Sequence, residues 1–128
     1  MIPRYRAWDK TCKTMYEADD IMYIDFEEKE ICVKTLFFEK PSRYDFDDIV
    51  LMQSTRLRDK NGKEIFEGDI VDSEDGILSG IVEFRPDLGM FVSTLIKYNN
   101  FERLCNVADS VYIIGNIYTN PELAEERS

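Results

Sequence analysis

The densest group of side chains that could carry out chemistry is a set of four carboxylates in the first half of the chain: Glu39, Asp45, Asp47 and Asp48. Hard oxygen ligands of this kind suit Mg²⁺ or Ca²⁺. Their spacing matches no calcium-binding loop, however, and a chain with 26 acidic residues among 128 forms such clusters by chance. We therefore expect no metal site and no other cofactor.

The usual side chains of nucleophilic catalysis are missing. The sequence has no histidine, which excludes Ser–His and Cys–His sites and removes the commonest metal ligand and proton carrier. Cys12, Cys32 and Cys105 are odd in number and widely spaced, so they fit neither a disulfide framework nor a zinc site. We interpret them as buried or half-buried thiols. Because no phosphate-binding loop is present either, we expect no catalytic residues and a protein that is not an enzyme.

The net charge of −10 is distributed unevenly. Residues 1–16 and 49–63 each carry four basic residues and one acidic residue, whereas residues 17–48 carry eleven acidic against four basic residues and residues 64–128 carry thirteen against four. A negative field disfavours nonspecific binding to duplex DNA, because attraction to phosphate supplies most of that affinity. We therefore expect weak nucleic-acid binding or none. The two basic segments either contact an anionic group or form ordinary solvated surface.

These basic segments contain the candidate binding surface, which combines aromatic and basic side chains. It consists of Arg4, Arg6, Trp8, Arg56, Arg58 and Lys60. Trp, Tyr and Arg dominate the energetics of protein interfaces, so this surface could bind a protein, with Trp8 as a core residue in the alternative. It could also hold a single nucleic-acid strand by stacking and phosphate contacts. A third interpretation makes residues 17–48 an acidic surface that imitates nucleic acid.

Strands must position these side chains, because no strong helical periodicity occurs in the first half of the chain. Alternating or β-branched and aromatic residues predict strands over residues 2–8, 12–17, 21–26, 31–38 and 49–53, with a charged loop over 41–48. In the second half they predict strands over 63–66, 70–71, 77–84, 90–96 and 110–118, and a helical turn from Asn120-Pro121. No apolar stretch reaches the roughly 20 residues of a membrane helix, and the first residues lack the apolar core of a signal peptide. We expect a cytoplasmic protein.

Residues 57–71 carry the clearest structural pattern. Asn61-Gly62 supplies the two positive-φ residues of a two-residue type I′ hairpin turn, and Glu67-Gly68-Asp69 is a tight bend before the next strand. Short strands and closely spaced turn glycines predict a small antiparallel barrel of the SH3 type. We expect a mainly β chain of two subdomains: an N-terminal β-rich subdomain with an acidic loop, residues 1–56, packed with an SH3-type barrel subdomain, residues 57–128.

An internal correspondence appears when the sequence is shifted by 50 residues. Residues 9–21 and 59–71 then agree at five of thirteen positions, and four more pairs are related in size or shape. Two explanations compete: a duplicated hairpin motif, or two ordinary hairpins that use the same turn chemistry. Either one predicts a hairpin at residues 9–13 that resembles the hairpin at residues 59–63.

Several ordered blocks resemble the YopX family. They are residues 2–9, Met52-Gln53 with residues 57–71, residues 80–84 and residues 114–123. The resemblance implies a bacteriophage or prophage protein with an SH3-type barrel in its C-terminal half, and no established enzymatic activity, cofactor or catalytic residue. Two departures stand out, since the family usually has an aromatic residue near Ser54 and a glycine near Arg56.

The function expected from these patterns is binding. We expect an adaptor module that engages an unknown host or phage protein in the bacterial cytoplasm, with nucleic-acid association or nucleic-acid mimicry as the alternative. Exposed edges of short strands can also pair between copies, so a homo-oligomer is a further expectation.

Overall fold

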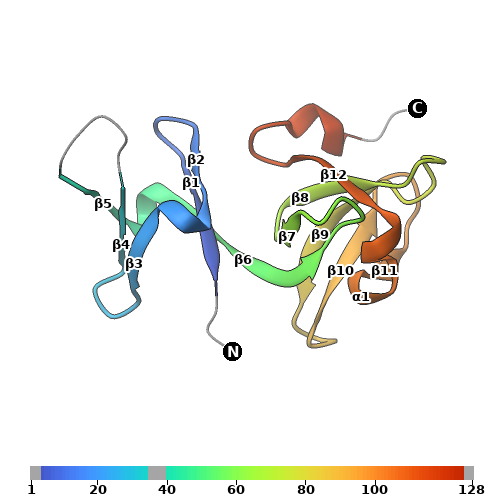
Figure 1. Cartoon of the computed structure of the whole chain (residues 1–128), viewed down its shortest axis with the longest axis horizontal. Coiled ribbons are helices and arrows are strands. Elements are labelled where there is room, and N and C mark those ends of the chain that lie inside the picture. The colour runs from blue at the N-terminus through green and yellow to red at the C-terminus, as the bar shows by residue number, and fades with distance from the viewer. Residues whose placement is uncertain (1–3, 35–39, 126–128) are drawn as a thin grey trace. The chain divides into compact units, whose positions relative to one another are not determined.

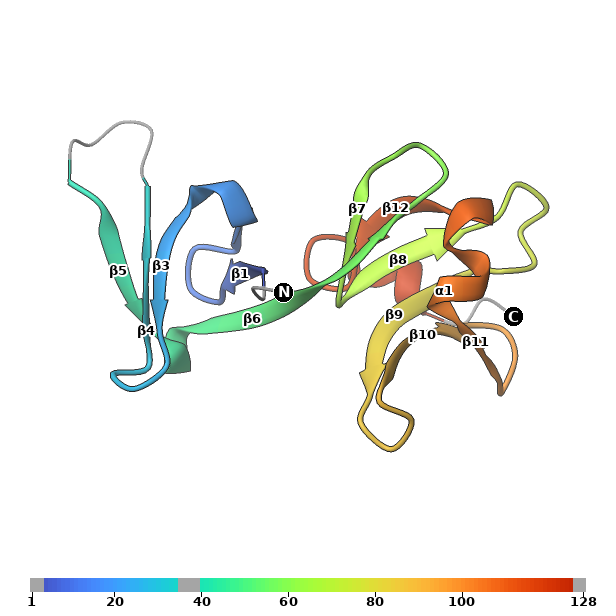
Figure 2. The ribbon, with the colours of Figure 1, turned by 60° about the horizontal axis from the view of Figure 1, so that its bottom comes forward.

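Two compact units make up the chain in the computed structural model, which describes residues 4–34 and 40–125 (Figure 1; Figure 2). Unit 1 comprises Met1–Gln53 and unit 2 comprises Ser54–Ser128. The boundary falls inside one strand, β6 (Ile49–Arg58), and the division predicted after residue 56 lies in the same strand. Strands dominate both units and form three antiparallel sheets, so the chain is mainly β as predicted.

Unit 1 is built from short strands around a small apolar core. The fully buried centre consists of Ala7, Ile31, Val33 and Ile49. β1 lies between β2 and β6, and β4 lies between β3 and β5. The elements are β1 (Tyr5–Asp9), β2 (Thr14–Tyr16), the 3₁₀ turn η1 (Ala18–Asp20), β3 (Ile21–Asp25), β4 (Glu30–Val33), β5 (Ser42–Asp45), the 3₁₀ turn η2 (Phe46–Asp48) and β6.

The segment over residues 41–48, predicted as a charged loop, contains β5 and η2 instead. β5 pairs with β4 in register and places Tyr44 opposite Ile31. The alternation was hard to see because Tyr44 is the one apolar residue in the strand. β4 ends at Val33, and the end of the predicted strand over residues 31–38 lies outside the described residues.

Unit 2 contains a five-stranded antiparallel sheet in the order β11-β10-β9-β8-β12. Its core is formed by six buried side chains: Ile65, Val71, Val82, Leu104, Ala108 and Val111. No helix in the described part of the chain is long and apolar enough to cross a membrane. The elements are β7 (Glu64–Phe66), β8 (Asp69–Asp72), β9 (Gly80–Arg85), β10 (Met90–Leu95), β11 (Phe101–Arg103), α1 (Leu104–Val107), the 3₁₀ turn η3 (Ala108–Ser110), β12 (Tyr112–Asn116) and the 3₁₀ turn η4 (Pro121–Ala124).

The expected closure of this sheet into an SH3-type barrel was wrong. Among the described residues, β11 and β12 are the two edges of the sheet and no ladder joins them. The reason lies in the connection between them. β11 is only three residues long and passes directly into α1, which packs against β10 and β11, so the chain reaches β12 through helical turns.

The hairpin between β6 and β7 is present, but its turn differs from the predicted type I′ turn. Gly62 has φ +82°, whereas Asn61 is not among the residues with positive φ. The Gly62 N–H donates to the Asp59 carbonyl (2.9 Å) and the Asp59 N–H donates to the Lys63 carbonyl (2.8 Å). This pattern is that of a three-residue loop with a glycine bulge, which needs one positive φ rather than two.

The predicted resemblance between the two hairpins is confirmed. β2 and β7 occupy residues exactly 50 positions apart, and each follows an aspartate that is buried and organises the turn. Asp9 Oδ1 accepts the N–H groups of Thr11 (2.9 Å) and Cys12 (3.1 Å). The two loops differ in length, since four residues separate the paired Asp9 and Thr14, whereas three separate Asp59 from Lys63.

A bulge interrupts β6 at Arg56, where φ is +64°. Two hydroxyl groups stabilise it: Ser54 Oγ accepts the Arg56 N–H (3.0 Å), and Thr55 Oγ1 accepts the Leu57 N–H (3.2 Å) and donates to the Ile65 carbonyl (2.7 Å). A positive φ is strained for a residue with a side chain and unstrained for glycine. Arg56 therefore occupies a backbone conformation that favours glycine, the residue that the YopX resemblance implies near this position.

Candidate functional site

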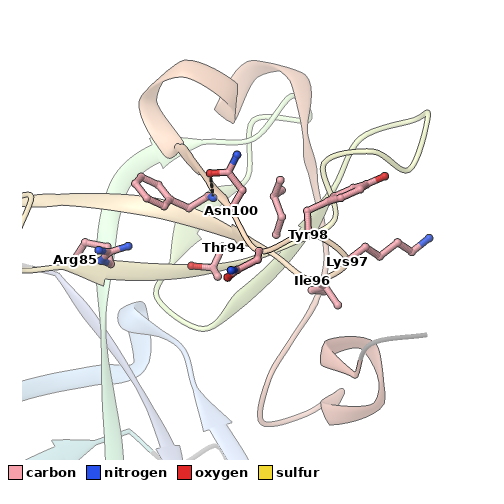
Figure 3. Close-up of a pocket in the computed structure, with 9 residues that line it drawn as sticks. Arg85, Thr94, Ile96, Lys97, Tyr98 and Asn100 are labelled. Atoms are coloured by element: carbon pink, nitrogen blue, oxygen red, sulfur yellow. Dashed lines mark hydrogen bonds between the residues drawn. The ribbon is translucent and has the colours of Figure 1, made fainter. Parts of the chain in front are cut away.

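A groove of about 600 Å³ opens in unit 2 beside the connection between β10 and β11 (Figure 3). Its lining comes from the ends of β9, β10 and β11 and from the five residues between β10 and β11. The lining residues are Arg85, Thr94, Leu95, Ile96, Lys97, Tyr98, Asn99, Asn100 and Phe101.

The backbone of the β10–β11 connection is held by its own hydrogen bonds. The Leu95 N–H donates to the Asn100 carbonyl (3.0 Å), and the Asn100 N–H donates to the Tyr98 carbonyl (2.8 Å). The Ile96 N–H donates to the Ser79 carbonyl (3.0 Å), which ties the connection to the start of β9. The turn is thereby fixed, while Tyr98 remains 55 % exposed and its side chain extends outward next to that of Lys97 (Figure 3).

Arg85 forms one wall of the groove. Its guanidinium lies 4.9 Å from the centre of the Phe101 ring and donates two hydrogen bonds to Asp87, at 3.0 and 2.8 Å. These bonds raise the pKa of Arg85 and lower the pKa of Asp87. Contacts with a ring and a carboxylate together hold the guanidinium in one orientation.

The lining has an unusual charge for this chain. None of the nine residues is acidic and two are basic, although the whole chain carries 26 acidic residues. Residues 88–101 form the longest stretch without a carboxylate side chain. Lys97 makes no hydrogen bond or ion pair with any described residue. The groove thus offers an unpaired ammonium, amide groups and an exposed aromatic ring.

Lys97 and Ile96 also line a second, smaller hollow of about 230 Å³. Its other walls include Asp72, Ile114 and Leu123. Because this hollow contains acidic side chains, its chemistry differs from that of the groove.

The N-terminal half of the predicted binding surface does not present a basic face. Arg6 is only 6 % exposed, so it cannot contribute to a surface. Arg4 is paired with Asp19 at 2.8 Å. Trp8 is half-buried in β1, opposite Met15 and Val50 in the ladders.

The other three residues of the predicted binding surface lie in and beside the β6–β7 hairpin. Arg56, Arg58 and Lys60 are all exposed. Arg58 donates to the Gly62 carbonyl (2.9 Å), and Lys60 forms an ion pair with Glu74 and lies 5.6 Å from the centre of the Tyr112 ring. Arg56 occupies the bulge. Arg58 and Lys60 are therefore already engaged within the chain.

The carboxylates and cysteines can also be placed. Asp45, Asp47 and Asp48 are exposed, and Glu39 lies outside the described residues. Across residues 4–34 and 40–125, no group of three or more His, Cys, Asp or Glu side chains is arranged to hold a metal ion. Cys32 is buried as expected, whereas the expectation of burial was wrong for Cys12 and Cys105, which are exposed free thiols.

Sequence reasoning overlooked the groove, because residues 98–100 read as a loose connection. A signal was present: an aromatic residue, a lysine and two asparagines inside the longest acid-free stretch of an acidic chain. The spatial proximity of Arg85 depends on the pairing of β9 with β10 and was not readable from the sequence.

Comparisons with known proteins identify the family. The YopX protein family matches residues 4–125. The chain belongs to the YopX family. It is similar to the crystal structure of protein EF1440 from Enterococcus faecalis, with 29 % identity, a TM-score of 0.67, and coverage of 98 % of this chain and 99 % of that one. It is also similar to the crystal structure of protein yopX from Bacillus subtilis, with 25 % identity, a TM-score of 0.62, and coverage of 94 % and 96 %. A search of the curated proteins gave no match.

Proposed function

We propose that this YopX-family chain is a non-enzymatic binding module that engages a protein partner through the groove beside the β10–β11 connection. The observation that carries the proposal is the composition of the lining: an unpaired lysine, an oriented arginine and an exposed tyrosine, with no acidic residue. Arg and Tyr are enriched among the residues that dominate interface energetics. The volume of about 600 Å³ is in the range of protein pockets that enclose a small ligand, which is enough room for one or two side chains of a partner.

The partner is sought among host or phage proteins of the bacterial cytoplasm, which is where the family resemblance puts such a chain. A binding role needs no catalytic group, and it agrees with a sequence that has no histidine. The groove is small and bounded by a fixed turn, so the proposed partner inserts one or two side chains rather than covering a flat area.

The test is a pull-down from phage-infected host lysate with three baits: the native chain, the double variant Lys97→Glu/Tyr98→Ala, and the control Lys63→Glu. Lys63 is exposed and its substitution changes the charge by the same amount at a site away from the groove lining. A stoichiometric protein that is captured by the native chain and the control, but lost with the double variant, supports the proposal. Equal capture by all three baits contradicts it.

Nucleic-acid association is the second candidate, favoured by the exposed ring of Tyr98 next to Lys97. A labelled single-stranded oligonucleotide distinguishes the two candidates. Binding that falls steeply with salt and is lost in Lys97→Glu/Tyr98→Ala would support strand binding over protein binding.

A further inference from the structure

The three-stranded sheet of β3, β4 and β5 has an outer face that does not join the core. Ile24, Ile31 and Tyr44 lie opposite one another and pack into the core of unit 1. Because side chains alternate along a strand, the residues on either side of each of these point to the opposite face. That outer face consists of Tyr23, Asp25, Glu30, Cys32, Arg43 and Asp45.

Three carboxylates form a row across this outer face. Asp25 lies directly opposite Glu30, and Glu30 lies directly opposite Asp45. Neighbouring strands are only about 4.8 Å apart, and like charges placed opposite each other destabilise a sheet. Within the described residues, Glu30 and Asp45 have no ion pair or hydrogen bond from their side chains. Among the described residues, no cation is therefore paired with Glu30 or Asp45, and the row presents like charges on neighbouring strands.

The adjacent row combines an aromatic side chain with a single cation. Tyr23, Cys32 and Arg43 lie opposite one another on the three strands. Cys32 is 4 % exposed although it is on the outer face, whereas Tyr23 is 40 % exposed. Partial burial raises the pKa of the Tyr23 hydroxyl, and Arg43 and Glu30 are its charged neighbours. An exposed ring next to carboxylates suits a guanidinium or ammonium group, through both charge and cation–π attraction.

We infer that the outer face of the β3–β4–β5 sheet is a docking surface for a cationic, Lys/Arg-rich segment of a protein partner. Charge complementarity selects this occupant, because the row of carboxylates repels nucleic acid and anionic membranes and attracts basic side chains. A bound segment relieves the repulsion between Asp25, Glu30 and Asp45. The inference goes beyond the proposed function, since it uses a different surface in the other unit.

The test measures binding of a fluorescein-labelled peptide of alternating lysine and threonine to the full chain by anisotropy, at about 0.15 M salt. The variant Glu30→Gln/Asp45→Asn removes two charges from the row, and Asp25 is kept because it accepts the N–H groups of Glu27 and Glu28 in the β3–β4 turn. The matched control, Asp109→Asn/Glu122→Gln, removes two charges from exposed residues of unit 2. A third variant, Tyr23→Ala, removes the ring.

We expect the row variant to weaken binding about tenfold and the control variant less than twofold. Tyr23→Ala is expected to weaken binding about threefold. The row variant is also expected to raise the midpoint of thermal unfolding, and this result would exclude unfolding as the cause of weaker binding. Equal weakening by the row and control variants assigns binding to net charge and overturns the inference, as does a native chain that does not bind the peptide.

Discussion

Asp59 is the residue on which the second hairpin depends. Its side chain is 5 % exposed and accepts three backbone N–H groups, those of Asn61, Lys63 and Ile113, each at 2.9 Å. The first two fix the turn, and the third joins the hairpin to β12, which is 54 residues away in sequence. One carboxylate thus supports both a local turn and a long-range contact.

Replacing this carboxylate with an amide removes one acceptor oxygen and places N–H groups against each other. We expect Asp59→Asn to lower the free energy of unfolding by about 2–3 kcal/mol, because a buried N–H is left without a partner. Urea unfolding measures the loss. The exposed substitution Asp109→Asn is the control and should change the stability by less than about 0.5 kcal/mol; equal effects of the two would contradict the role assigned to Asp59.

Arg56 stores backbone strain at its φ of +64°. Glycine relieves that strain but loses more conformational freedom on folding, so the two effects partly cancel. We expect Arg56→Gly to leave stability unchanged or to raise it by up to about 1 kcal/mol, and Arg56→Val to lower it by about 1 kcal/mol or more. Thermal unfolding of the two variants checks the order, and an Arg56→Gly variant less stable than Arg56→Val would refute it.

The raised pKa of Tyr16 predicts that unit 1 loses stability at alkaline pH. Its hydroxyl is 2.7 Å from that of Tyr44, and burial, this hydrogen bond and the charge of Asp9 all raise its pKa. The folded state therefore keeps the phenol proton at a pH where the unfolded chain loses it, near the ordinary pKa of about 10. The stabilisation is complete below that pH and is lost as the pH rises above it.

The variant Tyr16→Phe removes this titration. We expect the midpoint of unfolding of the native chain to fall between pH 9 and 11 more steeply than that of Tyr16→Phe, with both followed by circular dichroism. At pH 7 the variant should be less stable, because the hydroxyl of Tyr44 loses its partner. Parallel pH profiles would exclude Tyr16 as the source.

At the level of secondary structure, the strands β3, β4 and β5 place three carboxylates opposite one another. Glu30 lies between two other carboxylates in the ladder, so its neutralisation removes two repulsive pairs. We expect Glu30→Gln to raise the free energy of unfolding by about 0.5 kcal/mol. Glu102→Gln is the matched control in β11, where the residue opposite is Ser93, and it should give no gain. A loss of stability in Glu30→Gln would show that the row is not repulsive.

Elements with local sequence patterns were predictable, and those that depend on long-range pairing were not. Turn residues such as Gly62 and the apolar pairs on either side gave the hairpins and the β9–β10 pairing, because these are contacts between neighbours in sequence. β5 was missed because its alternation rests on Tyr44 alone. The closed barrel was wrongly expected, since β11 and β12 remain separate edges of the sheet, and pairing between strands at opposite edges is not readable from local sequence.

The same division holds for the sites. Composition indicated binding and excluded histidine-based chemistry, but it did not indicate that Arg6 is buried or that Arg4 is paired with Asp19. β1 has neighbours on both sides, which the sequence of β1 does not reveal. The groove and the outer face of β3–β4–β5 could not be predicted from the sequence, because strand pairing brings their residues together.

At the scale of the whole molecule, the chain carries surfaces of opposite character within a net charge of −10. The groove in unit 2 lacks acidic residues, and the outer face in unit 1 carries three carboxylates against one arginine. Two such surfaces on one chain fit the proposed adaptor role, because each selects a partner that the other repels.

β6 joins the two units without a loop between them, and this has a consequence for proteolysis. Proteases cut where the backbone is exposed and free to open, whereas residues 49–53 pair with β1, and Ser54 and Arg58 pair with β7. Limited digestion should therefore nick the turns of the hairpins and spare the boundary at Gln53–Ser54. The fragments of such a digest would therefore not correspond to units 1 and 2.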